Sequence, residues 1–139
     1  MFKQKINQNN QHLSDALDLI PLDGSISKTH YMAFLEEFLR AFPNDRDGIA
    51  TATRLLAMKR PDTFLCYNQA NREKLESEFG IRMPRFKGQN KNYEVYWDEV
   101  IERIHDCVWW QSDEPVDEIE AQAWRGRAAM LDAITYLLL

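Results

Sequence analysis

The sequence GIATATRLL at residues 48–56, followed by KRPDTF at residues 59–64, decides the fold that we expect. Apolar residues recur at helical spacing in the first stretch, which predicts a helix that begins directly after its glycine. Pro61 lacks a backbone N–H and disfavours the α region at the residue before it, so we expect this helix to end at about Lys59. Residues 63–67 are β-branched and aromatic enough to predict a short extended segment, which has no partner strand of similar character.

Helical periodicity also runs through most of the rest of the chain. Besides the central helix, the predicted helices cover residues 11–20, 30–41, 72–79, 93–110 and a final stretch from Pro115 onward. A chain of 139 residues is one domain by length, and an apolar content of 45% is typical of a folded globule. The sequence thus predicts a single compact all-α domain over residues 1–139, with five or six helices and a flexible stretch at residues 1–10.

Small polar residues and one glycine mark the expected ends of these helices. Ser27 or Thr29 can cap the helix over residues 30–41, because a side-chain oxygen can accept from the free N–H groups of the first turn. Asn68 or Asn71 can cap the helix over residues 72–79 in the same way. Gly80 is suited to end that helix.

Composition and the lack of long apolar runs narrow the cellular setting. Residues 1–15 are polar and contain no apolar core of signal-peptide length. No run approaches the roughly 20 apolar residues of a membrane span, so we expect a cytoplasmic protein without a membrane partner. Cys66 and Cys107 lack metal-ligand spacing, which predicts two buried thiols rather than a disulfide or a metal site.

Charge is divided unevenly along the chain, although the formal net charge is only −5. Residues 54–91 carry 9 basic and 4 acidic side chains, whereas residues 92–139 carry 3 basic and 11 acidic ones. A basic block inside an acidic chain can hold an anion locally, while the whole molecule is poorly suited to non-specific binding of duplex DNA. A solvated charge distribution without any ligand is the alternative.

The order of glycine, apolar helix, proline and extended run resembles the helix-hairpin-helix core of DNA base-excision glycosylases, over residues 29–80. The resemblance implies a helix-hairpin-helix-like centre, in which backbone N–H groups at a helix N-terminus hold a DNA phosphate. Together with the basic block, it assigns DNA or phosphate binding to Gly48, Ile49, Ala50, Arg54, Lys59, Arg60, Arg82, Arg85 and Lys87. An ordinary helical hairpin with a glycine cap is the alternative.

The catalytic positions of that family are not matched. Ala52 stands where the nucleophilic lysine is expected, and Asn68 stands where the catalytic aspartate is expected. These side chains cannot act as the nucleophile or the carboxylate, so we expect no glycosylase activity and assign no catalytic residue. A nuclease of the Pro-Asp…Glu-x-Lys kind is also disfavoured, because Glu73 and Lys74 are adjacent; Asp62 is expected to cap the turn after the proline.

Three longer strings resemble the shared pattern of a group of uncharacterised bacterial and phage proteins. They are TATRLLAMKRPDTF at residues 51–64, YWDEVIERI at residues 96–104 and WRGRAAMLDAI at residues 124–134. This resemblance covers most of residues 29–135 and implies no established activity.

The C-terminal region predicts a packed cluster of aromatic and arginine side chains. Its members are Trp97, Trp109, Trp110, Trp124, Arg125 and Arg127. We expect the two arginines to pair with Asp98, Glu102 or Asp132 across the last two helices. An arginine-based site for a nucleotide or a carboxylate is the alternative.

The histidines do not predict a catalytic or metal site. His12, His30 and His105 have no serine or cysteine at a useful spacing, and His105 adjoins Asp106 on a helix where neighbours do not face each other. We therefore predict no triad, no metal site and no cofactor.

The last three residues are consecutive leucines. Three successive helical positions span about 200° of arc, so one inward face cannot cover them all. Leu137, Leu138 and Leu139 are therefore predicted to form an interface, in a homodimer or in a partner's groove. Folding back against Leu13, Leu17 and Ile20 of the first helix, or continuation of the natural chain beyond this point, are the alternatives.

The sequence as a whole favours a non-enzymatic interaction module in DNA-associated or phage–host biology, with weak phosphate contact through the central basic block. One alternative is a small phage-type inhibitor, which binds a host or defence protein through its acidic C-terminal half. Another is a nucleic-acid enzyme with active groups that the sequence does not reveal.

Overall fold

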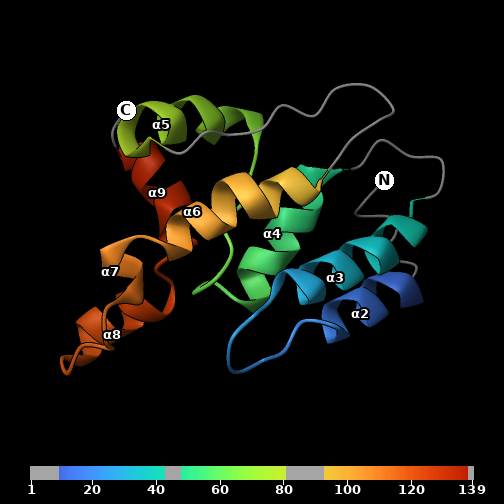
Figure 1. The fold of residues 1–139 in the computed structure, drawn as a ribbon, viewed down its shortest axis with the longest axis horizontal. Helices are drawn as coiled ribbons and strands as arrows, with labels where there is room; N and C mark the ends of the chain where they lie inside the picture. Colours follow the sequence, from blue (N-terminus) through green and yellow to red (C-terminus); the bar gives the residue numbers. More distant parts are fainter. Residues whose placement is uncertain (1–9, 43–47, 81–92, 138–139) are drawn as a thin grey trace.

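The computed structural model describes residues 10–42, 48–80 and 93–137, and every regular element within them is helical (Figure 1). This confirms the predicted all-α class. In the described part of the chain, no helix has both the length and the apolar character that a membrane span needs.

The first two described helices pack side by side. Helix α2 spans Gln11–Asp18 and α3 spans Lys28–Arg40. Ser27 caps α3, as one of the two predicted candidates: its hydroxyl accepts from the His30 N–H, and the His30 ring accepts from the Ser27 N–H at 3.0 Å. The two helices lie together at one end of the molecule (Figure 1).

The central helices follow the predicted stop and cap signals closely. Helix α4 spans Ile49–Lys59 and ends ahead of the proline. Helix α5 spans Gln69–Phe79, and it begins earlier than predicted because Asn68, rather than Asn71, is the N-cap. Asn71 completes a capping box by accepting from the Asn68 N–H at 3.1 Å. Gly80 closes α5 with a φ of 64°, a conformation that glycine adopts without steric cost.

The long helix predicted over residues 93–110 is interrupted. A π-helical segment η1 spans Tyr96–Ile101, α6 spans Glu102–His105 and α7 spans Val108–Gln111. Cys107 has an extended backbone, with φ −72° and ψ 137°, and it separates α6 from α7.

The predicted final helix is also divided, into α8 at Glu118–Arg125 and α9 at Met130–Leu137. The described residues therefore contain eight α-helical segments and one π-helical segment, where five or six helices were predicted. The increase comes from these two interruptions, which no proline marks in the sequence.

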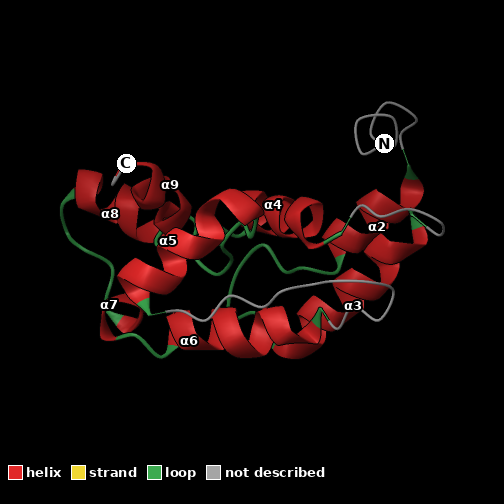
Figure 2. Cartoon of the chain, turned by 90° about the horizontal axis from the view of Figure 1, so that it is seen from above, coloured by secondary structure: helices red, strands yellow, loops and turns green. Residues whose placement is uncertain are grey.

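The segment between α4 and α5 is one of the loop stretches that Figure 2 shows among the helices. It has no regular secondary structure: residues 61–63, including the Thr63 that we expected to be extended, form a turn, and Phe64 and Leu65 are fully buried. No strand pairs with it in the described part of the chain. Side chains of the surrounding helices bond to its backbone instead. The hydroxyl of Tyr96 accepts from the Leu65 N–H at 3.2 Å and donates to the Leu65 carbonyl at 2.5 Å.

Two further side chains complete this substitute for a partner strand. The hydroxyl of Thr53 accepts from the Tyr67 N–H at 2.9 Å, and the amide of Asn71 donates to the Cys66 carbonyl at 2.6 Å. Buried backbone groups need partners whatever their source. A segment without regular secondary structure can therefore lie in the core of a helical protein.

Aromatic side chains from α3 and η1 surround this segment. The Tyr31 ring lies 5.6 Å from the Tyr96 ring and 5.8 Å from the Trp97 ring, measured between centroids. The hydroxyl of Tyr31 donates to the Tyr93 carbonyl at 2.7 Å. On the surface, Lys28 pairs with carboxylates near the start of η1, and these hydrogen bonds raise its pKa to about 12.

Candidate anion-binding site

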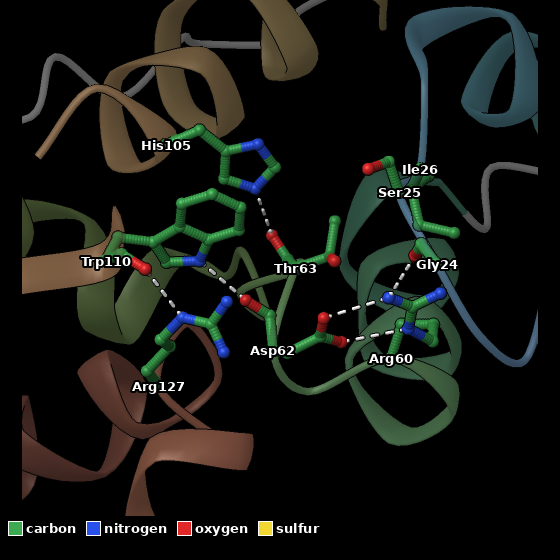
Figure 3. Close-up of a pocket in the computed structure, with 9 residues that line it drawn as sticks. All are labelled: Gly24, Ser25, Ile26, Arg60, Asp62, Thr63, His105, Trp110 and Arg127. Carbon is green, nitrogen blue, oxygen red and sulfur yellow. Dashed lines mark hydrogen bonds and ion pairs between the residues drawn. The ribbon is translucent and has the colours of Figure 1, made fainter. Parts of the chain in front are cut away.

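A recess of about 500 Å³ opens where the end of α4 meets the loop that precedes α3 (Figure 3). We call it the His105 recess. It is lined by Gly24, Ser25, Ile26, Arg60, Asp62, Thr63, His105, Trp110 and Arg127. Four stretches that are far apart in the sequence thus contribute to one hollow.

The centre of the recess is an ion pair between Arg60 and Asp62. Nε and Nη2 of the arginine donate to the two carboxylate oxygens, each at 2.9 Å. The same guanidinium donates to the carbonyls of Pro21 at 2.9 Å and Gly24 at 2.7 Å. Arg60 is only 7% exposed, so its charge is held inside the fold.

Asp62 is an ionised carboxylate whose two oxygens are occupied. Burial raises the pKa of Asp62, but the hydrogen bonds and the charge of Arg60 lower it by more, so the pKa lies below its ordinary value. A carboxylate in this state is a weak base. The pair therefore fixes the turn after α4, and it is poorly suited to proton transfer.

Stacked side chains form one wall of the recess. The His105 and Trp110 rings lie with centroids 3.8 Å apart and planes 15° apart. The guanidinium carbon of Arg127 lies 4.6 Å from the Trp110 ring centroid and 4.0 Å from the Trp124 ring centroid. His105, Trp110, Arg127 and Trp124 thus form a continuous column, which we call the stacked column. Trp97 meets its histidine end edge-on at 6.1 Å.

Hydrogen bonds fix the column to the turn after α4. The indole N–H of Trp110 donates to the Asp62 carbonyl at 2.6 Å, and Nε2 of His105 donates to the Thr63 carbonyl at 3.2 Å. Burial lowers the pKa of His105, so the ring is neutral at pH 7. This tautomer carries its proton on Nε2.

Arg127 is the cation of the column with donors to spare. Its Nε donates to the Trp110 carbonyl at 2.9 Å, and its Nη1 donates to the Trp124 carbonyl at 3.0 Å. A guanidinium has five N–H donors. Among the described residues, no other acceptor bonds to it. Burial lowers the pKa of Arg127, yet an arginine remains charged at any pH at which the protein is folded.

A second recess, of about 390 Å³, shares Arg60, Asp62 and Arg127 with the first. We call it the Trp124 recess. Its other lining residues are Leu22, Asp23, Lys59, Pro61, Trp124 and Arg125. Four cationic side chains and two carboxylates thus border this hollow, and one of the cations, Arg125, is paired with Glu114 and Glu118.

The described residues among those predicted to bind DNA lie at both ends of α4, and some of them are buried or bonded inside the fold. Gly48 caps α4 without a side-chain bond, Ile49 is buried, and Ala50 and Arg54 are exposed. Lys59, at the opposite end of that helix, donates to the Leu17 carbonyl. Arg60 is bonded inside the fold, as described above. Arg82, Arg85 and Lys87 lie outside the described residues.

The predicted aromatic and arginine cluster is brought together only in part. Trp110, Trp124 and Arg127 share the stacked column, with Trp97 at its end, whereas Trp109 is 43% exposed. Arg125 pairs with two surface carboxylates of its own neighbourhood, Glu114 at 2.6 Å and Glu118 at 3.1 Å.

The ion pairs that we predicted for the two arginines are wrong. Asp98 pairs with Lys28 beside α3, and Glu102 accepts from the Trp97 indole at 3.2 Å. Asp132 accepts from the Asn71 amide at 2.7 Å. Each of these three carboxylates thus bonds to a residue other than the two arginines.

Sequence reasoning missed His105, Ser25 and Thr63 as lining residues. On the continuous helix that we predicted, His105 and Trp110 would lie about 140° apart and could not stack. The extended backbone of Cys107 brings them face to face. The pairing of Arg60 with Asp62 was also missed, although the Lys-Arg-Pro-Asp string placed both residues beside the proline.

The residues at the positions that we compared with the catalytic residues of glycosylases and nucleases are capping, buried, ion-paired or exposed in the fold. Asn68 accepts from the Asn71 N–H at 2.9 Å as the cap of α5, and Ala52 is fully buried. Asp62 bonds to Arg60, while Glu73 is exposed on α5. Within the described residues, no three histidine, cysteine or carboxylate side chains are arranged to hold a metal ion.

The functional interpretation depends on these recesses, since comparison with known proteins provides no relative. No protein-family model, no curated protein and no solved structure matches the chain.

Proposed function

We propose that the chain is a non-enzymatic interaction module that binds phosphate groups, in the DNA-associated biology of a bacterium or its phage. One observation carries the proposal: Arg60 at the end of α4 and Arg127 between α8 and α9 line both recesses. Arg127 brings its remaining N–H donors to this place. Planar guanidinium donors match the oxygens of phosphate well.

The chemistry of the His105 recess suits binding better than acid–base catalysis. Asp62 has both oxygens engaged by Arg60, and the proton of His105 is held by the Thr63 carbonyl. The groups left available are donors: the outer nitrogens of Arg127 and the hydroxyl of Ser25, which is exposed at the recess. An anion is the ligand that such a set of donors complements.

The start of α4 supports a second phosphate contact on the same chain. Gly48 leaves the first turn without a side-chain cap, and the exposed Ala50 and Arg54 flank those N–H groups. A helix N-terminus with this pattern attracts anions. It is the element that the helix-hairpin-helix-like centre would contribute, and the two contacts lie at opposite ends of α4.

Binding of a single-stranded oligonucleotide at low salt tests the proposal. Fluorescence anisotropy should show weak binding that decreases modestly with salt, because few phosphates are contacted. Ser25→Glu places a carboxylate at the His105 recess and should weaken binding by at least about tenfold. Ser25→Gln is the matched control, of the same size as the glutamate variant but without charge; it replaces the hydroxyl with an amide donor and should weaken binding clearly less than Ser25→Glu does.

A further variant separates the two contacts. Arg54→Gln removes the exposed cation near the start of α4, and we expect a smaller loss than for Ser25→Glu. A loss with Arg54→Gln but none with Ser25→Glu would assign the phosphate site to the start of α4. No binding at low salt by the wild type would refute the phosphate-binding proposal as a whole.

A protein partner is the second candidate function, and exposed apolar side chains of the acidic C-terminal half favour it. Val108 is 86% exposed, and Val116 and Ile119, at the start of α8, are more than three-quarters exposed. Acidic residues Asp113, Glu114 and Glu120 adjoin them in the sequence. Apolar groups rimmed by charge are typical of docking surfaces. A partner retained from bacterial lysate after nuclease treatment, and lost with Ile119→Glu, would support this function.

The C-terminal leucines remain a proposed interface. Helix α9 ends at Leu137, and the side chains of residues 134–139 lie outside the described part of the structure. Sedimentation equilibrium of the whole chain, compared with a chain shortened by three residues, tests the homodimer. We expect the intact chain to sediment with the mass of a dimer and the shortened chain with the mass of a monomer.

A further inference from the structure

The donors of the His105 recess are arranged for one isolated phosphate group. Figure 3 shows the outer nitrogens of Arg127 turned toward Asp62 and the middle of the recess. Arg60 and Arg127 border the hollow with a single carboxylate between them, so its charged lining carries one net positive charge. Arg127 and Ser25 line this hollow from opposite sides, with Asp62 and Thr63 between them, as Figure 3 shows.

The surroundings of the recess disfavour a continuous polyanion. Residues 92–139 carry 11 acidic and 3 basic side chains, and two of those acids, Glu114 and Glu118, already pair with Arg125 beside the Trp124 recess. A nucleic-acid backbone that passed through the recess would bring several phosphates close to this acidic half. At such distances the phosphates and the carboxylates repel each other despite screening by salt. The end of a nucleic-acid strand can place one phosphate in the recess while the rest of the strand lies outside it.

The stacked column leaves no ring face of Trp110 for a nucleobase. His105 covers one face at 3.8 Å between centroids, and Arg127 covers the other at 4.6 Å, as Figure 3 shows. Stacking on aromatic faces is the usual way in which proteins hold unpaired bases. This wall of the recess therefore holds Arg127 in place and does not bind a base.

We infer that the His105 recess selects a terminal phosphomonoester over an internal phosphodiester, without contacts that distinguish the adjacent base. This inference rests on the proposed phosphate binding. At pH 7 a monoester carries a charge of roughly −1.5 to −2 and three terminal oxygens, whereas each internal phosphate carries one charge. The monoester gains more from Arg127 and from the hydroxyl of Ser25. The end of an oligonucleotide and a free mononucleotide share this chemistry.

Competition against a 3′-labelled hexanucleotide with a 5′-phosphate tests the inference on the full chain. The competitors are the same hexamer with a 5′-hydroxyl, a 5′-phosphorylated hexamer with a different first base, and a free nucleoside 5′-monophosphate. We expect removal of the 5′-phosphate to weaken competition at least tenfold and the change of base to matter less than twofold. Ser25→Glu should abolish the preference for the phosphate, whereas Ser25→Gln, which replaces the hydroxyl with an amide donor, should reduce it by less.

The outcomes separate this inference from the phosphate-binding proposal. If the hydroxyl and phosphate hexamers compete equally while Ser25→Glu still weakens both, the terminal selectivity is wrong and phosphate binding stands. If no hexamer binds the wild type, both are wrong. A monophosphate that competes as well as the phosphorylated hexamer identifies the free nucleotide as a sufficient ligand. A monophosphate that competes far less well shows that the strand adds contacts beyond its end, and both results support monoester selection.

Discussion

The hydroxyl of Tyr96 both accepts from the N–H and donates to the carbonyl of Leu65, at 3.2 Å and 2.5 Å. One side chain of η1 thereby provides hydrogen-bond partners for both backbone polar groups of a buried residue. This is the bonding that a neighbouring strand would supply in a sheet. It explains how the segment between α4 and α5 lies buried in an all-α fold.

Removing that hydroxyl should cost more than removing a hydroxyl with one backbone partner. Tyr96→Phe leaves two buried backbone groups of Leu65 without their partner, whereas Tyr31→Phe affects only the Tyr93 carbonyl. We expect Tyr31→Phe to lower the free energy of unfolding by about 1–2 kcal/mol and Tyr96→Phe by about twice as much. Urea denaturation measures both. Equal losses would contradict the strand-like role of Tyr96.

Thr53 should show the same dependence on a single hydroxyl. Thr53→Val keeps the shape of the side chain but removes the acceptor of the Tyr67 N–H, in a fully buried position. The expected loss is about 1–3 kcal/mol in the free energy of unfolding. Thr51→Val, on the same helix and only partly buried, is the matched control and should change stability by about 0.5 kcal/mol or less.

Asn71 links α5 to α9 through Asp132, so a second carboxylate at this position should be tolerated only in acid. Asn71→Asp places two carboxyl groups within about 3 Å of each other. Their repulsion raises a pKa in the folded state above its unfolded value, so stability is retained below the unfolded pKa and lost as the pH rises. We expect a loss of about 3 kcal/mol at pH 7 that shrinks toward pH 4.

The control for this variant lies three residues earlier. Asn68→Asp keeps an oxygen that can cap α5, and its charge is favourable at a helix start. Its stability at pH 7 should equal or exceed that of the wild type. If both variants lose stability equally, the loss does not arise from Asp132.

His105 should make the protein less stable in mild acid. Burial lowers the pKa of His105, so the unfolded chain binds this proton at a higher pH than the folded chain does. The stability that the neutral ring contributes is therefore present above the unfolded pKa of about 6.5 and is lost as the pH falls toward the folded pKa. Unfolding free energies measured between pH 8 and pH 5 should fall less steeply in His105→Gln than in the wild type. Identical slopes would show that this ring does not titrate as described.

The parts of the fold that follow local rules could be predicted from the sequence. Pro61 ends α4, Ser27 and Asn68 cap their helices, and Gly80 closes α5, because each of these effects depends on a few adjacent residues. The interruption at Cys107 has no such signal. It arises where the Trp110 indole and the His105 ring both bond to the turn after α4, and these contacts cross more than 40 residues.

The candidate site depends on that same interruption. The sequence supplied two groups of interest, the basic end of α4 and the arginines near Trp124, but it assigned them to separate roles. Only the fold places Arg60 and Arg127 on either side of Asp62. Prediction from periodicity keeps a helix continuous where its apolar stripe continues, so it could not find a column built across a break.

We propose Arg127, rather than the exposed arginines of the surface, as the principal contact of the phosphate. The most direct measurement is a nitrogen-resolved NMR titration of the arginine side chains with inorganic phosphate on the whole chain. We predict large, saturable shifts of the Arg127 guanidinium resonances and of the Trp110 indole N–H, smaller shifts of Arg54 at the start of α4, and none of Arg103, which is exposed elsewhere on the surface. Shifts confined to Arg54, or uniform small shifts of all exposed arginines without saturation, would contradict the claim.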